Sequence, residues 1–308
     1  MTKNAKARFL SVGGGKEKSS KRRSSKAAVF FGLIRFLLTL NTCIVYPFLM
    51  AKILIGTSGY SYHEWEGVFY PHHMKKEDYL GYYAAQFSTV EINQTYYRMP
   101  TVDGSRRLLE AGGQGLTFAV KAIETLTKLI HPDKWQEEAK TYITAIEPLI
   151  EAGRLEAVLF QFPDTFSYTD ENRKYMDRLF RAFEGIPSVA EFRNSEWGNN
   201  RVIEGLRKRG IAYASMDLPE LEGLPSILDV ATAKLAYFRL NGKNIEAWWG
   251  SEKGKRYDYL YSDVELGRLK ERIQFIMQKV DKVLVYFNNH TEGKAALNAM
   301  EMKKMMEK

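Results

Sequence analysis

The chain has 308 residues, 45% hydrophobic and 27% charged, so it can bury a large core and is not disordered throughout. Its formal charge of +8 says nothing about the folded body, because residues 1–49 hold ten of the 45 Lys and Arg and one of the 37 Asp and Glu, which leaves 35 basic and 36 acidic residues for 50–308. The single cysteine, Cys43, excludes an internal disulfide and a cysteine-based zinc site, and fits a cytoplasmic location.

Residues 1–49 are a basic, Ser-rich run followed by an apolar stretch, in the order of a signal peptide or membrane anchor. Arg35 and three polar residues interrupt the apolar stretch, whereas a spanning helix needs about 20 mostly apolar residues. Met50 is followed at once by AKILIGTSGY, a plausible natural start. We therefore expect an extension, 1–49, outside a single folded domain, 50–308. The alternatives are an anchor at 27–49, which alone would bring membrane contact, and a disordered basic arm.

Eight short, apolar, β-branched runs predict strands after Met50. They are KILIGTS from Lys52, TVEIN from Thr89, TFAVKA from Thr117, AVLFQF from Ala157, SVAEFR from Ser188, AYASMD from Ala212, LAYFRLN from Leu235 and KVLVYFNN from Lys282.

Segments with helical spacing of apolar residues separate these runs, such as 133–153 and 263–280, and Asp263 is expected to cap the second. Eight alternating strands and helices in about 250 residues predict an α/β fold, a TIM-like (β/α)8 barrel. A doubly wound open sheet is the alternative. It is disfavoured because no G-x-G-x-x-G follows the first strand, so no nucleotide cofactor is expected.

Nearly every predicted strand ends in polar side chains, and barrel enzymes gather their chemistry at these ends. The positions are Ser58, Tyr60, Glu91, Asn93, Lys121, Gln161, Glu191, Arg193, Asp217, Arg239, Asn241, Asn288 and Asn289. Side chains two apart on a strand share a face, so three carboxylates and three cations would converge if that face is the barrel interior. The alternative is a salt-bridge layer that only closes the barrel.

The connection between Asn241 and Asp263 is long and mixes aromatic and cationic side chains, Trp248 among them. Aromatic faces beside cations can stack bases or sugars. Tyr60 and Trp65 in the loop after the first strand are expected at the same end of the barrel. The alternative for the long connection is that it forms a lid whose aromatic side chains pack on the barrel rim.

The motifs GTSGYSYHEWEGVFYP, FSTVEINQTYYRMP, FAVKA, LFQFP, EFRNSEW, YFRLNG and VYFNNHTEGKAALNA resemble those of the YecE-like proteins, domain of unknown function 72. The similarity runs from Ile53 to Asn298. It implies a somewhat irregular TIM-like barrel, related in shape to the endonuclease IV and xylose isomerase barrels. It does not supply an activity.

Three functions fit these residues. In the first, the barrel binds and hydrolyses a phosphate-bearing or nucleic-acid ligand. Glu91, Glu191 and Asp217 would then be catalytic and could hold Mg²⁺ or Mn²⁺. In the second, the same carboxylates serve a glycosidase as acid and base or nucleophile. In the third, the barrel binds a small anionic ligand without turning it over.

The remaining candidates would contact the ligand in each case. They are Ser58, Tyr60, Trp65, Asn93, Lys121, Gln161, Arg193, Arg239, Asn241, Trp248, Asn288 and Asn289.

Overall fold

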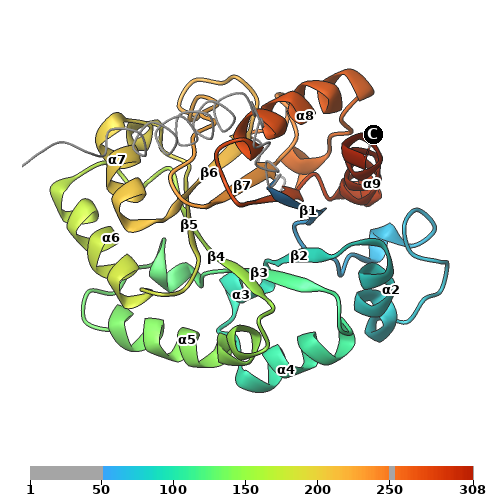
Figure 1. Ribbon diagram of the computed structural model, residues 1–308, viewed down its shortest axis with the longest axis horizontal. Coiled ribbons are helices and arrows are strands. Elements are labelled where there is room, and N and C mark those ends of the chain that lie inside the picture. The colour runs from blue at the N-terminus through green and yellow to red at the C-terminus, as the bar shows by residue number, and fades with distance from the viewer. Residues whose placement is uncertain (1–50, 250–253, 308) are drawn as a thin grey trace, which may run out of the picture. The chain divides into compact units, whose positions relative to one another are not determined.

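The structure, a computed structural model, describes residues 51–249 and 254–307, so the predicted extension 1–49 lies outside the described residues. The described part contains eight parallel strands, which confirm the eight predicted runs and the TIM-like barrel (Figure 1). The strands are β1 (Lys52–Thr57), β2 (Thr89–Ile92), β3 (Thr117–Lys121), β4 (Leu155–Phe162), β5 (Ser188–Phe192), β6 (Ala212–Asp217), β7 (Leu235–Leu240) and β8 (Lys282–Phe287).

Helices lie around the outside of the strands, as expected for parallel strands joined by crossover connections (Figure 1). The α-helices are α2 (Tyr79–Gln86), α3 (Gln94–Tyr97), α4 (Val102–Ala111), α5 (Trp135–Glu151), α6 (Asp170–Ala182), α7 (Asn200–Arg209), α8 (Asp263–Met277) and α9 (Lys294–Glu307). Short 3-10 helices cover His63–Trp65, Lys76–Asp78, Glu124–Leu126, Ser195–Trp197, Lys255–Tyr257 and Thr291–Gly293. Among the described residues, no helix is both long and apolar enough to cross a bilayer.

The barrel is irregular where β1 meets β2. These strands share one isolated bridge, Ser58 with Glu91, because the phenol of Tyr83 sits between them. It accepts the N–H of Thr57 at 2.8 Å and donates to the carbonyl of Thr89 at 3.1 Å. Gly56 permits this approach, since a Cβ there would lie 2.1 Å from the Thr89 oxygen. A second weak seam joins β5 and β6, which pair over two residues only.

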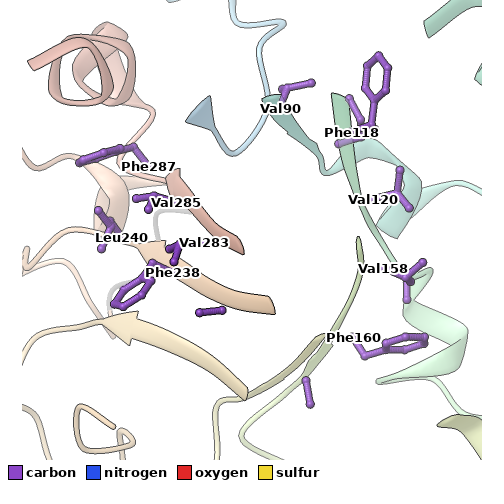
Figure 2. Packing of buried hydrophobic residues seen from close by; sticks show 14 of the residues in the cluster. Val90, Phe118, Val120, Val158, Phe160, Phe238, Leu240, Val283, Val285 and Phe287 are labelled. Carbon is purple, nitrogen blue, oxygen red and sulfur yellow. The ribbon is translucent and has the colours of Figure 1, made fainter. Parts of the chain in front are cut away.

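Side chains alternate between the two faces of each strand, and this divides the core into a layer outside the barrel and a layer inside it. Outward-facing Val, Leu and Phe side chains pack under the helices, as the labelled residues of Figure 2 show. Inside the barrel, alanines of β3, β4 and β6 leave room for Tyr237 and Tyr286. The inner apolar layer is Leu54, Ala119, Ala157, Leu159, Val189, Ala212, Ala214, Tyr237, Leu284 and Tyr286. Beyond this layer, toward the carboxyl ends of the strands, lies a group of buried charged and amide residues, and one ion pair, Lys282 with Glu156, lies at the opposite end.

The N-cap of helix α8 lies one residue earlier than predicted, because the helix begins at Asp263 itself. Ser262, not Asp263, is the N-cap, and its hydroxyl accepts the N–H of Glu265. The Glu265 carboxylate accepts the N–H of Ser262 at 2.9 Å in return. The prediction of Asp263 was wrong because this reciprocal capping box satisfies two backbone donors, which a single aspartate does not.

Candidate functional site

Five charged side chains meet inside the barrel at the carboxyl ends of the strands, and we call them the mouth cluster. They are Glu91, Lys121, Glu191, Arg193 and Arg239. The pairing of strands in register brings together residues from β2, β3, β5 and β7, as strand alternation predicted.

Arg239 is the centre of the mouth cluster and is 2% exposed. Its Nε and Nη2 donate to the two carboxylate oxygens of Glu91, at 2.9 and 2.7 Å. Its Nη1 donates to Gln161 at 3.1 Å and lies 3.3 Å from Oε2 of Glu191. A buried guanidinium with two carboxylates and an amide is satisfied on all sides, which makes Arg239 a structural support for the cluster.

Glu191 is fully buried and held by two guanidiniums. Nε of Arg193 donates to its Oε1 at 2.7 Å, and Arg239 contacts the other oxygen. Burial raises the pKa of Glu191, but the charges of Arg193, Arg239 and Lys121 outweigh burial and keep the pKa below its usual value. Glu191 is therefore an ionised acceptor near neutral pH.

Lys121 differs from the other cations of the cluster. Its Nζ lies 3.9 Å from the ring centroid of Tyr96, but it makes no hydrogen bond or ion pair with any residue in the described ranges. Burial lowers the pKa of Lys121 to about 7, and the charge of Arg239 adds to this effect while Glu191 opposes it. A lysine in this state exchanges its proton near neutral pH.

Amide and hydroxyl groups complete the inner wall of the mouth. Ser58 donates to Glu91 and accepts from Nδ2 of Asn93 at 2.7 Å. The Oδ1 of Asn241 accepts from Nη2 of Arg193 at 3.2 Å and from Asn288 at 2.9 Å. Gln161, through its contact with Arg239, belongs to the same network. The structure thus brings nine predicted site residues into one hydrogen-bonded network: Ser58, Glu91, Asn93, Gln161, Glu191, Arg193, Arg239, Asn241 and Asn288. Lys121 lies beside this network.

Asp217 does not join the two glutamates, because it faces the helix layer. Its Oδ1 accepts from Nη1 of Arg272 on α8 at 2.8 Å, and its Oδ2 lies 3.4 Å from Nζ of Lys243. The phenol of Tyr261 donates to Oδ2 at 3.0 Å. Asp229 contacts the same Arg272 at 2.8 Å. We call Asp217, Asp229, Lys243, Tyr261 and Arg272 the outer cluster.

Four other predicted site residues lie outside the mouth network. Trp65 is fully buried in the outer core and donates its Nε1 to the carbonyl of His290. Tyr60 packs against Tyr83 and lines a cleft of about 420 Å³ between α2 and α4. Asn289 donates to the carbonyl of Tyr259 and to Asn298 of α9. The contacts of Trp65 and Asn289 fasten loops to the barrel, and Tyr60 faces a cleft separate from the mouth network.

Trp248 is also buried, at 1% exposure, and packs on Met216 and Leu218 at the carboxyl end of β6. This contact agrees with the lid alternative for the long loop, at least for Trp248. Trp249 is 60% exposed, and residues 250–253 of the loop lie outside the described residues.

Two residues of the mouth were missed at the sequence level. The phenol of Tyr237 donates to Oε2 of Glu91 at 2.6 Å, and the Tyr96 ring lies under Lys121. Tyr237 stands two residues before Arg239 on one strand, so the alternation used for Arg239 and Asn241 would have found it. No local signal marks Tyr96, since its position depends on how α3 packs beside β3.

The described residues contain no group of three or more His, Cys, Asp or Glu side chains placed to hold a metal ion. Glu91 and Glu191, two of the three carboxylates considered as metal ligands, face guanidiniums, and the third, Asp217, belongs to the outer cluster. The carboxylates of the mouth are therefore partners of guanidiniums, and its remaining polar groups are cations, amides and hydroxyls.

Comparisons with known proteins agree with this architecture. The family described as "Protein of unknown function DUF72" matches residues 54–308. The UPF0759 protein YunF of Bacillus subtilis (strain 168) is 26% identical over 270 residues, 83% of this chain and 95% of that protein.

Two solved structures share the fold. A DUF72 family protein from Thermotoga maritima MSB8 is 36% identical with a TM-score of 0.78, and the match covers 83% of this chain and all of that one. One from Enterococcus faecalis V583 is 24% identical with a TM-score of 0.75, covering 83% of this chain and 96% of that one. The chain therefore belongs to the DUF72 family, and the YecE-like resemblance of its motifs is confirmed.

Proposed function

We propose that the mouth of the barrel binds a small ligand through an anionic group, a phosphate or a carboxylate. The observation that carries this proposal is the imbalance of the mouth cluster, in which three cations face two carboxylates. Arg239 pairs with Glu91 and Arg193 pairs with Glu191, so the surplus charge is that of Lys121, and the Arg193 side chain is 14% exposed and has further N–H donors for a ligand. A guanidinium and an ammonium around one opening are a common arrangement for binding oxyanions.

The same geometry argues against the glycosidase alternative. A glycosidase needs one carboxylic acid that keeps its proton at working pH. Glu191 has a lowered pKa, and both oxygens of Glu91 accept hydrogen bonds from Arg239. Neither carboxyl group is placed to act as a general acid, so carboxylate-based glycoside cleavage has no support from these contacts.

The proposal is tested by calorimetric titration of the full chain with inorganic phosphate, acetate and a short oligothymidylate. Arg193→Gln should weaken binding of the preferred anion at least about tenfold, since one charge-assisted hydrogen bond to an anion contributes roughly 1.5–3 kcal/mol. Arg193→Lys, which retains the charge, should keep part of the affinity. Arg106→Gln is the matched control, because Arg106 forms an exposed pair on α4.

Each result decides one point. Phosphate binding that depends on Arg193 supports the proposal, and tighter binding of the oligonucleotide would identify the phosphate as that of a nucleic acid. Release of phosphate from an aryl phosphate ester, lost in Arg193→Gln, would extend the proposal to hydrolysis. No binding of any anion, or binding that Arg193→Gln leaves unchanged, would refute it.

A further inference from the structure

Lys121 is the one buried cation of the mouth cluster for which no described residue provides a hydrogen bond or ion pair. Its side chain enters the barrel from the last position of β3 and is 7% exposed. At the other end of the barrel, Lys282 lies 2.6 Å from the carboxylate of Glu156, as buried or half-buried lysines usually require. Lys121 has only the face of the Tyr96 ring, so its nitrogen is available to another molecule.

The surroundings of Lys121 favour the unprotonated amine. Burial, assisted by Arg239 and Arg193, lowers the pKa of Lys121 to about 7. Roughly half of the molecules therefore carry a free amine at neutral pH, compared with far fewer than one in a hundred for an ordinary lysine. A free amine has a nucleophilic lone pair, and lysines activated in this way attack carbonyl carbons.

The neighbours of Lys121 define which carbonyl compound would fit. Lys121 and Arg193 both lie close enough to the buried Glu191 for their charges to lower its pKa, so the two cations are near one carboxylate. Asn93 and Gln161 belong to the hydrogen-bonded network around Arg239 and their amide groups are only half-buried, whereas Ser58 is fully buried and donates its hydroxyl hydrogen to Glu91. A ligand with an anionic group next to a carbonyl carries one group for each of these two cations, the anion for Arg193 and the carbonyl carbon for Lys121.

We infer that Lys121 is a nucleophile that forms an imine with the carbonyl carbon of an anionic ligand, a 2-oxo acid or a phosphorylated aldehyde or ketone. The inference rests on the proposed function, because Arg193 is the group that holds the anion. The Nζ lone pair forms a bond to the carbonyl carbon, and the carbonyl oxygen takes up a proton. The carbon–oxygen bond then breaks, a C=N bond forms, and one water leaves carrying the ligand oxygen and both amine hydrogens. No oxidant or reductant is needed.

The experiment is reductive trapping on the full chain. The protein is incubated near neutral pH with glyoxylate, pyruvate or glyceraldehyde 3-phosphate, then treated with borohydride, which reduces an imine to a stable amine. Peptide mass mapping should find the adduct on Lys121 in preference to exposed lysines such as Lys134. The rate of trapping should rise from about pH 6 to pH 8 and then level, following the fraction of free amine.

Two variants control for structural effects. Lys121→Arg keeps a cation near Tyr96 but cannot form the imine, so it should lose the adduct while still binding the anion used for titration. Lys134→Arg should leave trapping at Lys121 unchanged. If Lys121 is labelled no faster than the exposed lysines with all three compounds, the inference is overturned.

The inference and the proposed function fail in different ways. Anion binding that depends on Arg193, without any adduct on Lys121, would refute the imine and leave the binding function standing. If neither added phosphate nor Arg193→Gln slows formation of the adduct on Lys121, the result would support Lys121 as a nucleophile and refute the anion site.

Discussion

The mouth cluster and the outer cluster both lie at the carboxyl ends of the strands, and both are built from buried carboxylates and cations. In the outer cluster, Asp217 and Asp229 match Arg272 and Lys243 in number, and every one of these charges has an opposite partner within 3.4 Å. In the mouth cluster, two carboxylates face three cations, and Lys121 has no such partner among the described residues.

This difference suits the outer cluster to a structural role and the mouth cluster to the binding of a ligand. The outer cluster connects β6 to α8 and to the connection after β7, so its balanced charges hold elements together. The mouth cluster also contains one ion pair of equal and opposite charges, Arg239 with Glu91, which supports the other residues of the cluster. Lys121, beside that pair, has no hydrogen bond or ion pair with a described residue, and a buried charge without a partner is unfavourable unless a ligand supplies one.

The largest expected effect on the free energy of unfolding comes from removing the guanidinium of Arg239. Arg239→Met leaves Glu91 and Glu191 buried without their shared guanidinium, and losing one partner of a buried pair typically costs about 3–5 kcal/mol. The free energy of unfolding, measured in urea by tryptophan fluorescence, should fall by about that amount. The control Arg106→Met, in an exposed pair with Asp103, should lose less than about 1 kcal/mol. Equal small losses in both variants would show that Arg239 is not a support.

Removing the unpartnered cation should have the opposite sign. Lys121→Met keeps the length of the side chain and removes a charge whose burial is unfavourable, so at about pH 6 the variant should be more stable, by on the order of 3 kcal/mol at most. The folded pKa of Lys121 is about 7 and the ordinary value is 10.5, so between them the unfolded chain binds more protons. The stability of the wild type should therefore rise with pH across this window.

The measurement is urea unfolding of the wild type and Lys121→Met across that pH range. The gap between the two proteins should narrow as the pH rises from about 7 toward 10. The exposed substitution Lys134→Met should show no such dependence. A variant less stable than the wild type at pH 6 would mean that Lys121 stabilises the fold, and would remove the electrostatic reason for treating it as a nucleophile.

A smaller effect is expected in the outer cluster. Asp217→Asn leaves Arg272 with Asp229 as a remaining partner, so we expect a loss of about 2–3 kcal/mol in the free energy of unfolding. The affinity for phosphate should not change, because Asp217 faces the helices. Weaker phosphate binding in this variant at unchanged stability would mean that the two clusters act as one site.

The sequence predicted the strands and the paired positions well, for a physical reason. Glu191 and Arg193, or Arg239 and Asn241, lie two apart on one strand, and the pleat places both on the same face whatever the rest of the fold does. The barrel architecture followed from the alternation of strands and helices.

The facing of single residues was harder to predict. Asp217 lies two and four residues after Ser215 and Tyr213 on β6, and all three face the helices. The local sequence does not indicate which face of this strand points into the barrel. Asn288 and Asn289 are neighbours and so must point to opposite faces, and only Asn288 points inward. The direction of Trp65 depends on its contact with His290, 225 positions away, and no local pattern carries that information.

The smallest expected effect concerns a single phenol of the outer cluster. The Tyr261 hydroxyl donates to Oδ2 of Asp217 at 3.0 Å and accepts the N–H of Gly242 at 2.9 Å. Tyr261→Phe removes both bonds, but Arg272 and Lys243 still neutralise the carboxylate, so the loss should be about 1–2 kcal/mol, below that of Asp217→Asn. Thermal and urea unfolding measure it, with Tyr97→Phe as the exposed control. A loss as large as that of Arg239→Met would mean that the outer cluster depends on a neutral hydrogen bond rather than on charge balance, and the contrast between the two clusters would then have to be drawn on hydrogen bonding instead.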